Sequence, residues 1–228
     1  MAGNFDCIGL GVDNEDQLHD LVVRLASAAG ERLSTDAGEY AIWRSRTGAE
    51  LWFHLGPAPE DEDGEREILG VTPFFEGRSD VLLNIDEAIK RPDDNALEGA
   101  FHGWLDENTI IFDAVDFAAH SGRPLPAHRQ VRLAGFAREI NVPAGDGEGA
   151  VGRSLHSHPT ASAAQLTGQI ADFAELINEA TGQRFYWLQV EGPLGAYDIV
   201  AAPHVVNGEL AAGATVNVAC AFFGRILD

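Results

Sequence analysis

Residues 214–226, ATVNVACAFFGRI, decide the fold class of this chain. Apolar residues alternate with small or polar ones along this stretch, at Val216, Val218, Cys220 and Phe222. A period of two is typical of a strand that buries one face and exposes the other. The stretch therefore predicts a sheet that is covered on one side.

Further stretches upstream are rich in apolar and β-branched residues and also predict strands. They are residues 68–76, 79–85, 97–105, 109–115, 130–142, 184–191 and 196–202. Glycine and proline mark loops at 119–128 and 143–153. Many strands of similar length favour a barrel or a strongly curled sheet, so we expect an antiparallel, barrel-like β region over 68–228.

Residues 162–181 predict a single helix inside this β region. Ser162 and Gln165 have the spacing of a capping box. Apolar residues then recur at helical spacing, at Leu166, Ile170, Phe173 and Ile177. Gly182 follows as a terminator.

The first 56 residues predict a smaller unit of strand, helix and hairpin. Residues 5–12 favour a strand, and residues 13–30 favour a helix that is capped by Asp13. The helix has an apolar face made of Leu18, Leu21, Val22, Leu25 and Ala29. Two apolar runs, Tyr40 to Arg46 and Glu50 to Leu55, flank Thr47-Gly48 and predict a hairpin. We expect an α+β fold in which this unit packs on the larger region.

The two units are separated by an acidic loop, residues 57–67, PAPEDEDGERE. The segment superficially suggests a calcium loop. With Gly64 as the turn glycine, the first and last ligand positions would fall on Pro59 and Gly70. Neither residue can bind an ion through its side chain, which excludes an EF-hand.

The overall charge limits the classes of partner. The net charge is −21, from 36 acidic and 15 basic residues, so phosphate backbones and anionic lipid surfaces are repelled. No apolar run reaches the roughly 20 residues of a membrane helix. Cys7 and Cys220 each lie within an apolar, strand-like run, which favours buried thiols. We expect a cytoplasmic protein that binds neither nucleic acid nor membranes.

Residues 155–159, Leu-His-Ser-His-Pro, are the most suggestive of chemistry. His156 and His158 point the same way on an extended segment, and imidazole is a good zinc ligand. This run resembles the His-x-His-Pro of the JAMM-type zinc hydrolases. The positions of that family's downstream serine and aspartate hold Leu166 and Gln169 here. Histidines on predicted strands, His54 and His102, could complete a shell if the fold brings them near.

Two further resemblances bear on the fold. The opening strand, helix and hairpin resemble one module of the vicinal-oxygen-chelate fold, but the first strand carries Asp6 where that family has a histidine or glutamate ligand. Residues 167–168, 178–185, 197–201 and 222–227 resemble a family of uncharacterised bacterial proteins. This second resemblance implies no activity.

Several familiar motifs of enzyme sites are absent from the sequence. It contains no Gly-x-Gly-x-x-Gly, no P-loop and no Gly-x-Ser-x-Gly. The leading hypothesis is therefore a non-enzymatic cytoplasmic module without a cofactor, which binds a small molecule or another protein. The alternative is a zinc-dependent hydrolase that uses His156 and His158.

Overall fold

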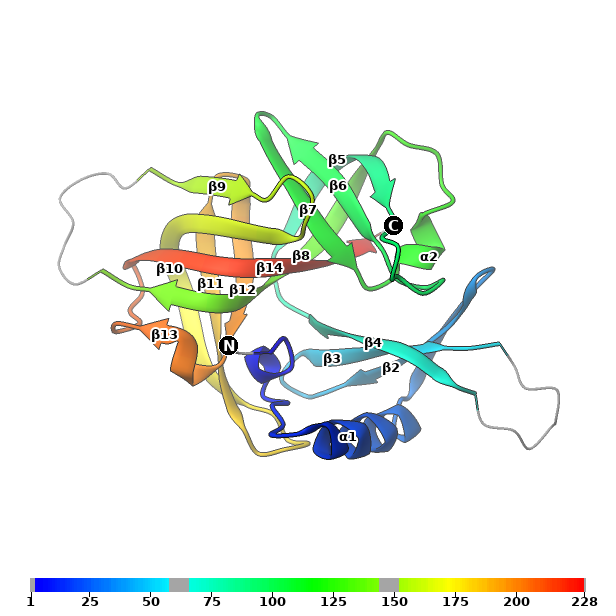
Figure 1. The fold of residues 1–228 in the computed structure, drawn as a ribbon. Helices are drawn as coiled ribbons and strands as arrows, with labels where there is room; N and C mark the ends of the chain where they lie inside the picture. The colour runs from blue at the N-terminus through cyan, green and yellow to red at the C-terminus, as the bar shows by residue number, and fades with distance from the viewer. Residues whose placement is uncertain (1–2, 58–65, 144–151, 228) are drawn as a thin grey trace.

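The computed structural model describes residues 3–57, 66–143 and 152–227 (Figure 1). These residues form a four-stranded sheet, a ten-stranded sheet and a few helical segments. The helical segments are α1 (Glu15–Ser27), α2 (Phe117–His120) and the 3-10 turns Asp6–Ile8 and Pro203–Val205. Most of the acidic loop 57–67 and of the loop 143–153 lies outside the described residues. No helix in the described ranges is long and apolar enough to cross a membrane.

The smaller sheet contains the predicted hairpin, which is confirmed. Its strands run antiparallel in chain order: β1 (Glu31–Thr35), β2 (Gly38–Arg44), β3 (Ala49–Leu55) and β4 (Ile68–Phe75). Every residue of β3 is buried, because α1 covers one face of the sheet and the larger sheet covers the other (Figure 1). Residues 68–76 were expected in the larger region, but β4 pairs with β3 and belongs to the smaller sheet.

The N-terminal segment differs from the sequence prediction. Residues 5–12 were expected to form a strand, and they contain the 3-10 turn Asp6–Ile8 instead. Gly9 ends this turn with φ of 70°, a left-handed conformation that an extended strand excludes. The predicted helix is confirmed as α1, but its N-cap is Asn14, whose side chain accepts from the Gln17 N–H.

The larger sheet contains all of the predicted strands of residues 79–226. They are β5 (Asp80–Ile89), β6 (Ala100–Leu105), β7 (Asn108–Ala114), β8 (Ala127–Asn141), β11 (Arg184–Gly192), β12 (Gly195–Ala201) and β14 (Thr215–Leu227). Three strands of the larger sheet were not predicted, β9 (Ser154–Ser157), β10 (Ala163–Ile177) and β13 (Val206–Asn207).

The strand pairing closes into two rings that share β8 and β14. One ring runs β8, β14, β10, β11, β12 and back to β8. The other runs β8, β14, β7, β6, β5 and back to β8. The barrel-like prediction is right in this coarse sense. The sheet is mixed rather than antiparallel, because β12 and β13 pair with β8, and β7 with β14, in parallel.

The predicted helix 162–181 is wrong, because these residues form the strand β10. Ala164, Leu166 and Ile170 are buried at even positions, as a strand requires. A bulge lies between Ile170 and Asp172. Phe173 and Ile177, which completed the helical spacing in the sequence, are exposed apolar residues on this strand.

The two sheets are held together by an apolar interface and a fixed linker. Phe136 and Phe223 on the outer surface of the rings pack edge to face, with centroids 4.7 Å apart, in the same core as β2 and β3. Leu21 and Leu25 of α1 belong to this core too. Between the sheets, Asp198 accepts hydrogen bonds from the backbone N–H groups of Arg78 and Ser79.

Candidate functional site

A cavity of about 250 Å³ lies where the smaller sheet meets the rings, and we call it the interface cavity. Its walls come from β4, from the connection between β5 and β6, from β7 and β14, and from the N-terminal segment. The apolar part of the wall is formed by Val71, Pro73, Ala114 and Phe223. Crevices between packed units are common ligand sites.

The polar wall of the interface cavity is mostly acidic. It consists of Asn4, Thr72, Arg91, Asp94, Glu98 and Asp113. Three carboxylates therefore face one guanidinium. Among the described lining side chains, carboxylates outnumber the one positive charge, and this balance favours a cation over an anion in the cavity.

Arg91 and Asp113 are held in place by their neighbours. The Arg91 Nη2 donates to Asp113 Oδ1 at 2.5 Å, and the backbone N–H of Arg91 donates to Asp94 Oδ2 at 2.8 Å. The second oxygen of Asp113 accepts from Ser162 Oγ at 2.8 Å. Each carboxylate keeps free lone pairs, because an ionised carboxylate has about four acceptor positions.

Glu98 is connected to a buried histidine behind the cavity wall. Glu98 Oε1 lies 3.2 Å from His54 Nδ1, and the other ring nitrogen, Nε2, lies 3.1 Å from Thr72 Oγ1. A hydrogen bond from His54 lowers the pKa of Glu98 below its usual 4.5. Gly70 makes room for this contact, since a Cβ there would lie 2.7 Å from Glu98 Oε1.

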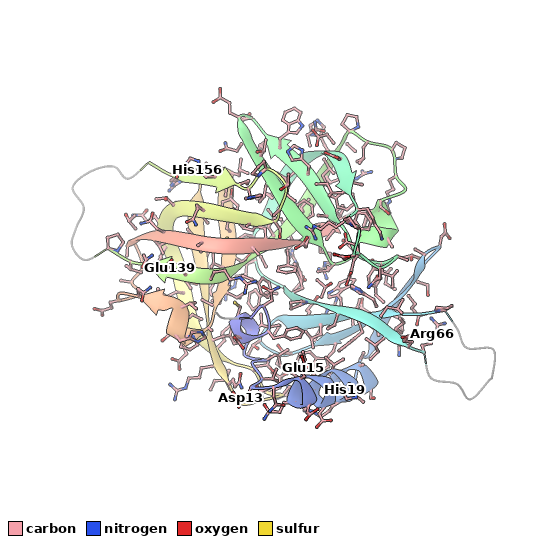
Figure 2. The ribbon with its side chains drawn as sticks, viewed as in Figure 1. Asp13, Glu15, His19, Arg66, Glu139 and His156 are labelled. Carbon is pink, nitrogen blue, oxygen red and sulfur yellow. The ribbon has the colours of Figure 1, made fainter. Side chains whose placement is uncertain are left out.

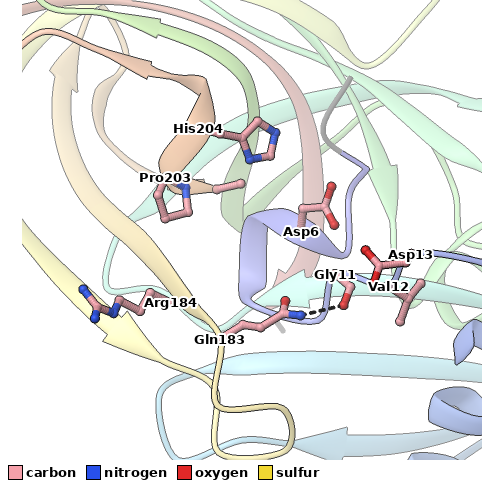
Figure 3. Close-up of a pocket in the computed structure, with 9 residues that line it drawn as sticks. Asp6, Gly11, Val12, Asp13, Gln183, Arg184, Pro203 and His204 are labelled. Atoms are coloured by element: carbon pink, nitrogen blue, oxygen red, sulfur yellow. Dashed lines mark hydrogen bonds between the residues drawn. The ribbon is translucent and has the colours of Figure 1, made fainter.

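A second hollow of about 440 Å³ lies beside the N-terminal turn (Figure 3). Asp6 and His204 border it, and Arg184 extends away from Asp6 (Figure 3). Gln183 donates to the carbonyl oxygen of Gly11 at 2.8 Å. Asp13, Arg184 and His204 are exposed, so this hollow has fewer fixed polar groups than the interface cavity.

His156 and His158, the predicted metal ligands, are both exposed. His156 lies on β9 at the rim of the larger sheet, opposite Gln165 of β10 (Figure 2). His158 Nδ1 lies 3.3 Å from the backbone nitrogen of Thr160. In residues 3–57, 66–143 and 152–227, no three His, Cys, Asp or Glu side chains lie close enough together to hold a metal ion.

The other histidines and the cysteines have separate surroundings. His102 Nδ1 contacts Asp86 at 2.6 Å on the outside of β6, and His54 contacts Glu98. These contacts do not involve His156 or His158. Both thiols are free and buried, and burial raises the pKa of Cys7 to about 11 and of Cys220 to about 12. Thiols of this kind are poor nucleophiles.

No protein-family model, curated protein or solved structure matches the chain. The function is therefore argued from the interface cavity. Thr72, Glu98 and Asp113 could not be recognised as site residues from the sequence, because they lie on separate segments and form no motif. One signal was present: His54 stands in the apolar run 51–55, and a histidine buried in such a run needs polar partners.

Proposed function

We propose that this protein is a cytoplasmic binding module for a small organic cation, which occupies the interface cavity. The observation that carries the proposal is the placement of Asp94, Glu98 and Asp113 around one cavity, with Arg91 as the sole cation among the described lining residues. The volume of about 250 Å³ lies below the roughly 300–1,000 Å³ of drug-sized pockets, which favours a small ligand.

An organic cation suits the arrangement better than a metal ion does. A metal draws its ligands around one point at short distance. Within the described part of the chain, no three side chains of the suitable types gather in that way. An ammonium group with an apolar tail can instead contact a carboxylate and the wall of Pro73 and Phe223 together. The net charge of −21 also attracts cations to the surface.

Binding without catalysis is supported by the side chains present. The described lining contains no cysteine, serine or histidine, and the carboxylates of Asp113 and Glu98 are already engaged by neighbouring side chains. The zinc-hydrolase alternative would need a third ligand beside His156 and His158.

The proposal is tested with three probes of one size: n-propylammonium, propan-1-ol and propionate. Each is titrated into ¹⁵N-labelled protein and followed by amide chemical shifts. We expect saturable shifts around the interface cavity for n-propylammonium, with a dissociation constant on the order of millimolar for so small a ligand. The neutral and anionic probes should give none.

Matched variants locate the binding site. Asp113→Asn should weaken n-propylammonium binding, because it removes one of the charges that line the cavity. Asp172→Asn is the control, since Asp172 is an exposed carboxylate that contacts Arg78 outside the cavity. Equal binding of all three probes, or equal loss in the two variants, would reject a cation site here.

A further inference from the structure

His54 connects two polar groups that line the interface cavity. It lies on β3 and is 1 % exposed, so it cannot meet a ligand directly. One ring nitrogen contacts Glu98 and the other contacts Thr72. A change in the protonation of His54 can therefore alter the hydrogen bonding of both Glu98 and Thr72, which line the cavity.

The contact with Glu98 determines where the neutral ring carries its hydrogen. An ionised carboxylate only accepts hydrogen bonds, so the 3.2 Å contact calls for a hydrogen on Nδ1. The side-chain NH₂ of Asn95 lies 3.1 Å from the same Nδ1 and only donates, so it competes for a lone pair there. We assign the hydrogen to Nδ1 because a hydrogen bond to a charged carboxylate is the stronger of the two, and Asn95 can donate to the carbonyl oxygen of Leu69 at 3.5 Å. With this assignment, Nε2 has a lone pair and accepts from the Thr72 hydroxyl at 3.1 Å.

Protonation of His54 would change what the cavity offers. Both ring nitrogens become donors, so Nε2 donates to Thr72 Oγ1 and the hydroxyl hydrogen of Thr72 is released. The positive ring also compensates the charge of Glu98. The cavity loses negative charge and gains a donor, and both changes disfavour a cation.

We propose that His54 is a positioning residue that makes cation binding in the interface cavity depend on pH. Binding is tighter while His54 is neutral and weaker once it is protonated. This inference rests on the proposed function. It extends that function by naming how the same site is regulated.

Few of the described groups face His54, and among them Glu98 is the one that carries a charge. Glu98 and Asn95 approach from the connection between β5 and β6, and Thr72 approaches from β4. Tyr40 of β2 packs against the ring at 5.5 Å between centroids. Burial raises the pKa of Tyr40 above its usual 10.0, so it stays neutral. Lys90 Nζ donates to the carbonyl oxygen of Glu98 at 3.0 Å.

The first test needs no ligand. Ring ¹⁵N shifts of His54 and the carboxyl ¹³C shift of Glu98 are followed through a pH titration. We expect the Nδ1 shift to show a bound hydrogen at every pH. Only the Nε2 shift should change as the ring takes up its second hydrogen. In His54→Gln the Glu98 pKa should rise towards 4.5. Hydrogen on Nε2 in the neutral ring, or an unchanged Glu98 pKa, would overturn the proposal.

Thr72→Val provides a second variant in case His54→Gln does not fold. Valine keeps the β-branched shape on β4 and removes only the hydroxyl. The Nε2 shift of His54 should change while the Glu98 titration stays the same. Thr109→Val, on β7, is the matched control and should alter neither signal. An unchanged Nε2 shift in Thr72→Val would refute the contact.

The second test measures n-propylammonium binding at about pH 8 and about pH 5.5, which bracket the range where histidines titrate. We expect affinity to fall about threefold to tenfold at the lower pH, since a tenfold change corresponds to one pKa unit of coupling. The fall should disappear in His54→Gln and persist in His102→Gln, which breaks the exposed pair with Asp86.

The outcomes separate the two proposals. If n-propylammonium binds equally at both pH values, or if His54→Gln keeps the fall, the role of His54 is wrong and the binding function stands. If it binds at neither pH, the proposed function and the pH regulation that rests on it both fail.

Discussion

The indole Nε1 of Trp187 on β11 donates a 2.6 Å hydrogen bond to Oδ1 of Asp198 on β12, and both residues are buried. The other oxygen of Asp198 accepts from the backbone N–H groups of Arg78 and Ser79 at 2.8 and 2.7 Å. One carboxylate thus fixes the linker between the two sheets to the ring of β8, β10, β11, β12 and β14.

Replacing this carboxylate by an amide should destabilise the protein. In Asp198→Asn, the side-chain NH₂ must face either the Trp187 N–H or the two backbone N–H groups, and donors cannot bond donors. We expect the free energy of unfolding in urea to fall by about 1–3 kcal/mol. Asp172→Asn, at an exposed ion pair, should change it by less than about 0.5 kcal/mol. Similar losses in the two variants would contradict this account.

Gly77 should be intolerant of a side chain because the linker passes directly over Asp198. A Cβ at position 77 would lie 2.2 Å from Asp198 Cγ. Gly77→Ala should therefore cost about 1–3 kcal/mol of unfolding free energy, as overpacking does. Gly122→Ala is the control, since a Cβ there meets nothing within 4 Å. If the two variants are equally stable in urea, the linker is looser than described.

Glu50 should make stability fall as pH rises. It is fully buried, and burial raises its pKa above the usual 4.5, although Trp52 and Arg44 lower it in part. The folded state then holds a proton that the unfolded state releases earlier. This contribution is complete below pH 4.5 and is lost as pH rises through the folded pKa.

Glu50→Gln tests that sign, because glutamine cannot titrate. The advantage of the wild type over the variant should shrink as urea unfolding is measured at increasing pH from about 4 to 7. The exposed Glu175→Gln serves for comparison and should show no such trend. An advantage that grows with pH would mean that the ion pair with Arg44 outweighs burial.

Leu25 should be essential to the attachment of α1. It is 3 % exposed and belongs to the core shared with β2 and β3. Leu25→Ala should lower the unfolding free energy by about 2–5 kcal/mol. Val23, on the same helix, is 45 % exposed, and Val23→Ala should cost less than about 0.5 kcal/mol. A loss that small for Leu25→Ala would refute the packing.

His156→Ala and His158→Ala should leave stability unchanged within about 0.5 kcal/mol, as at other exposed positions. Any metal that co-purifies with the protein should also stay the same, as measured by elemental analysis. A drop of many degrees in melting temperature, or the loss of tightly held zinc, would instead support the zinc-hydrolase alternative.

Local patterns in the sequence were sufficient to predict most of the strands. The alternation of residues 214–226 and the hairpin around Thr47-Gly48 both depend on neighbours in sequence, and both are confirmed. The helix predicted over 162–181 failed because Phe173 and Ile177 are exposed apolar residues on a strand, and they happen to complete a helical spacing. The strand is determined by its pairing with β11 and β14, which a pattern along one segment does not contain.

The interface cavity was beyond the reach of sequence patterns for a similar reason. Thr72, Glu98 and Asp113 lie on three separate segments, and they come to one cavity only where the smaller sheet meets the rings. Asp113 was visible only as one acid among 36. The two histidines at 156 and 158 were conspicuous in sequence, yet both are exposed.

The sharing of β14 by both rings has a consequence for how the chain is made. Strands β5 to β12 leave the ribosome before β14, but neither ring can close until β14 (Thr215–Leu227) has emerged. During synthesis, β8 and β10 therefore have unpaired edges until β14 is made. Unpaired strand edges can pair with other chains and lead to aggregation. A sheet whose strands pair in chain order has no such interval, because each new strand covers the edge of the one before it.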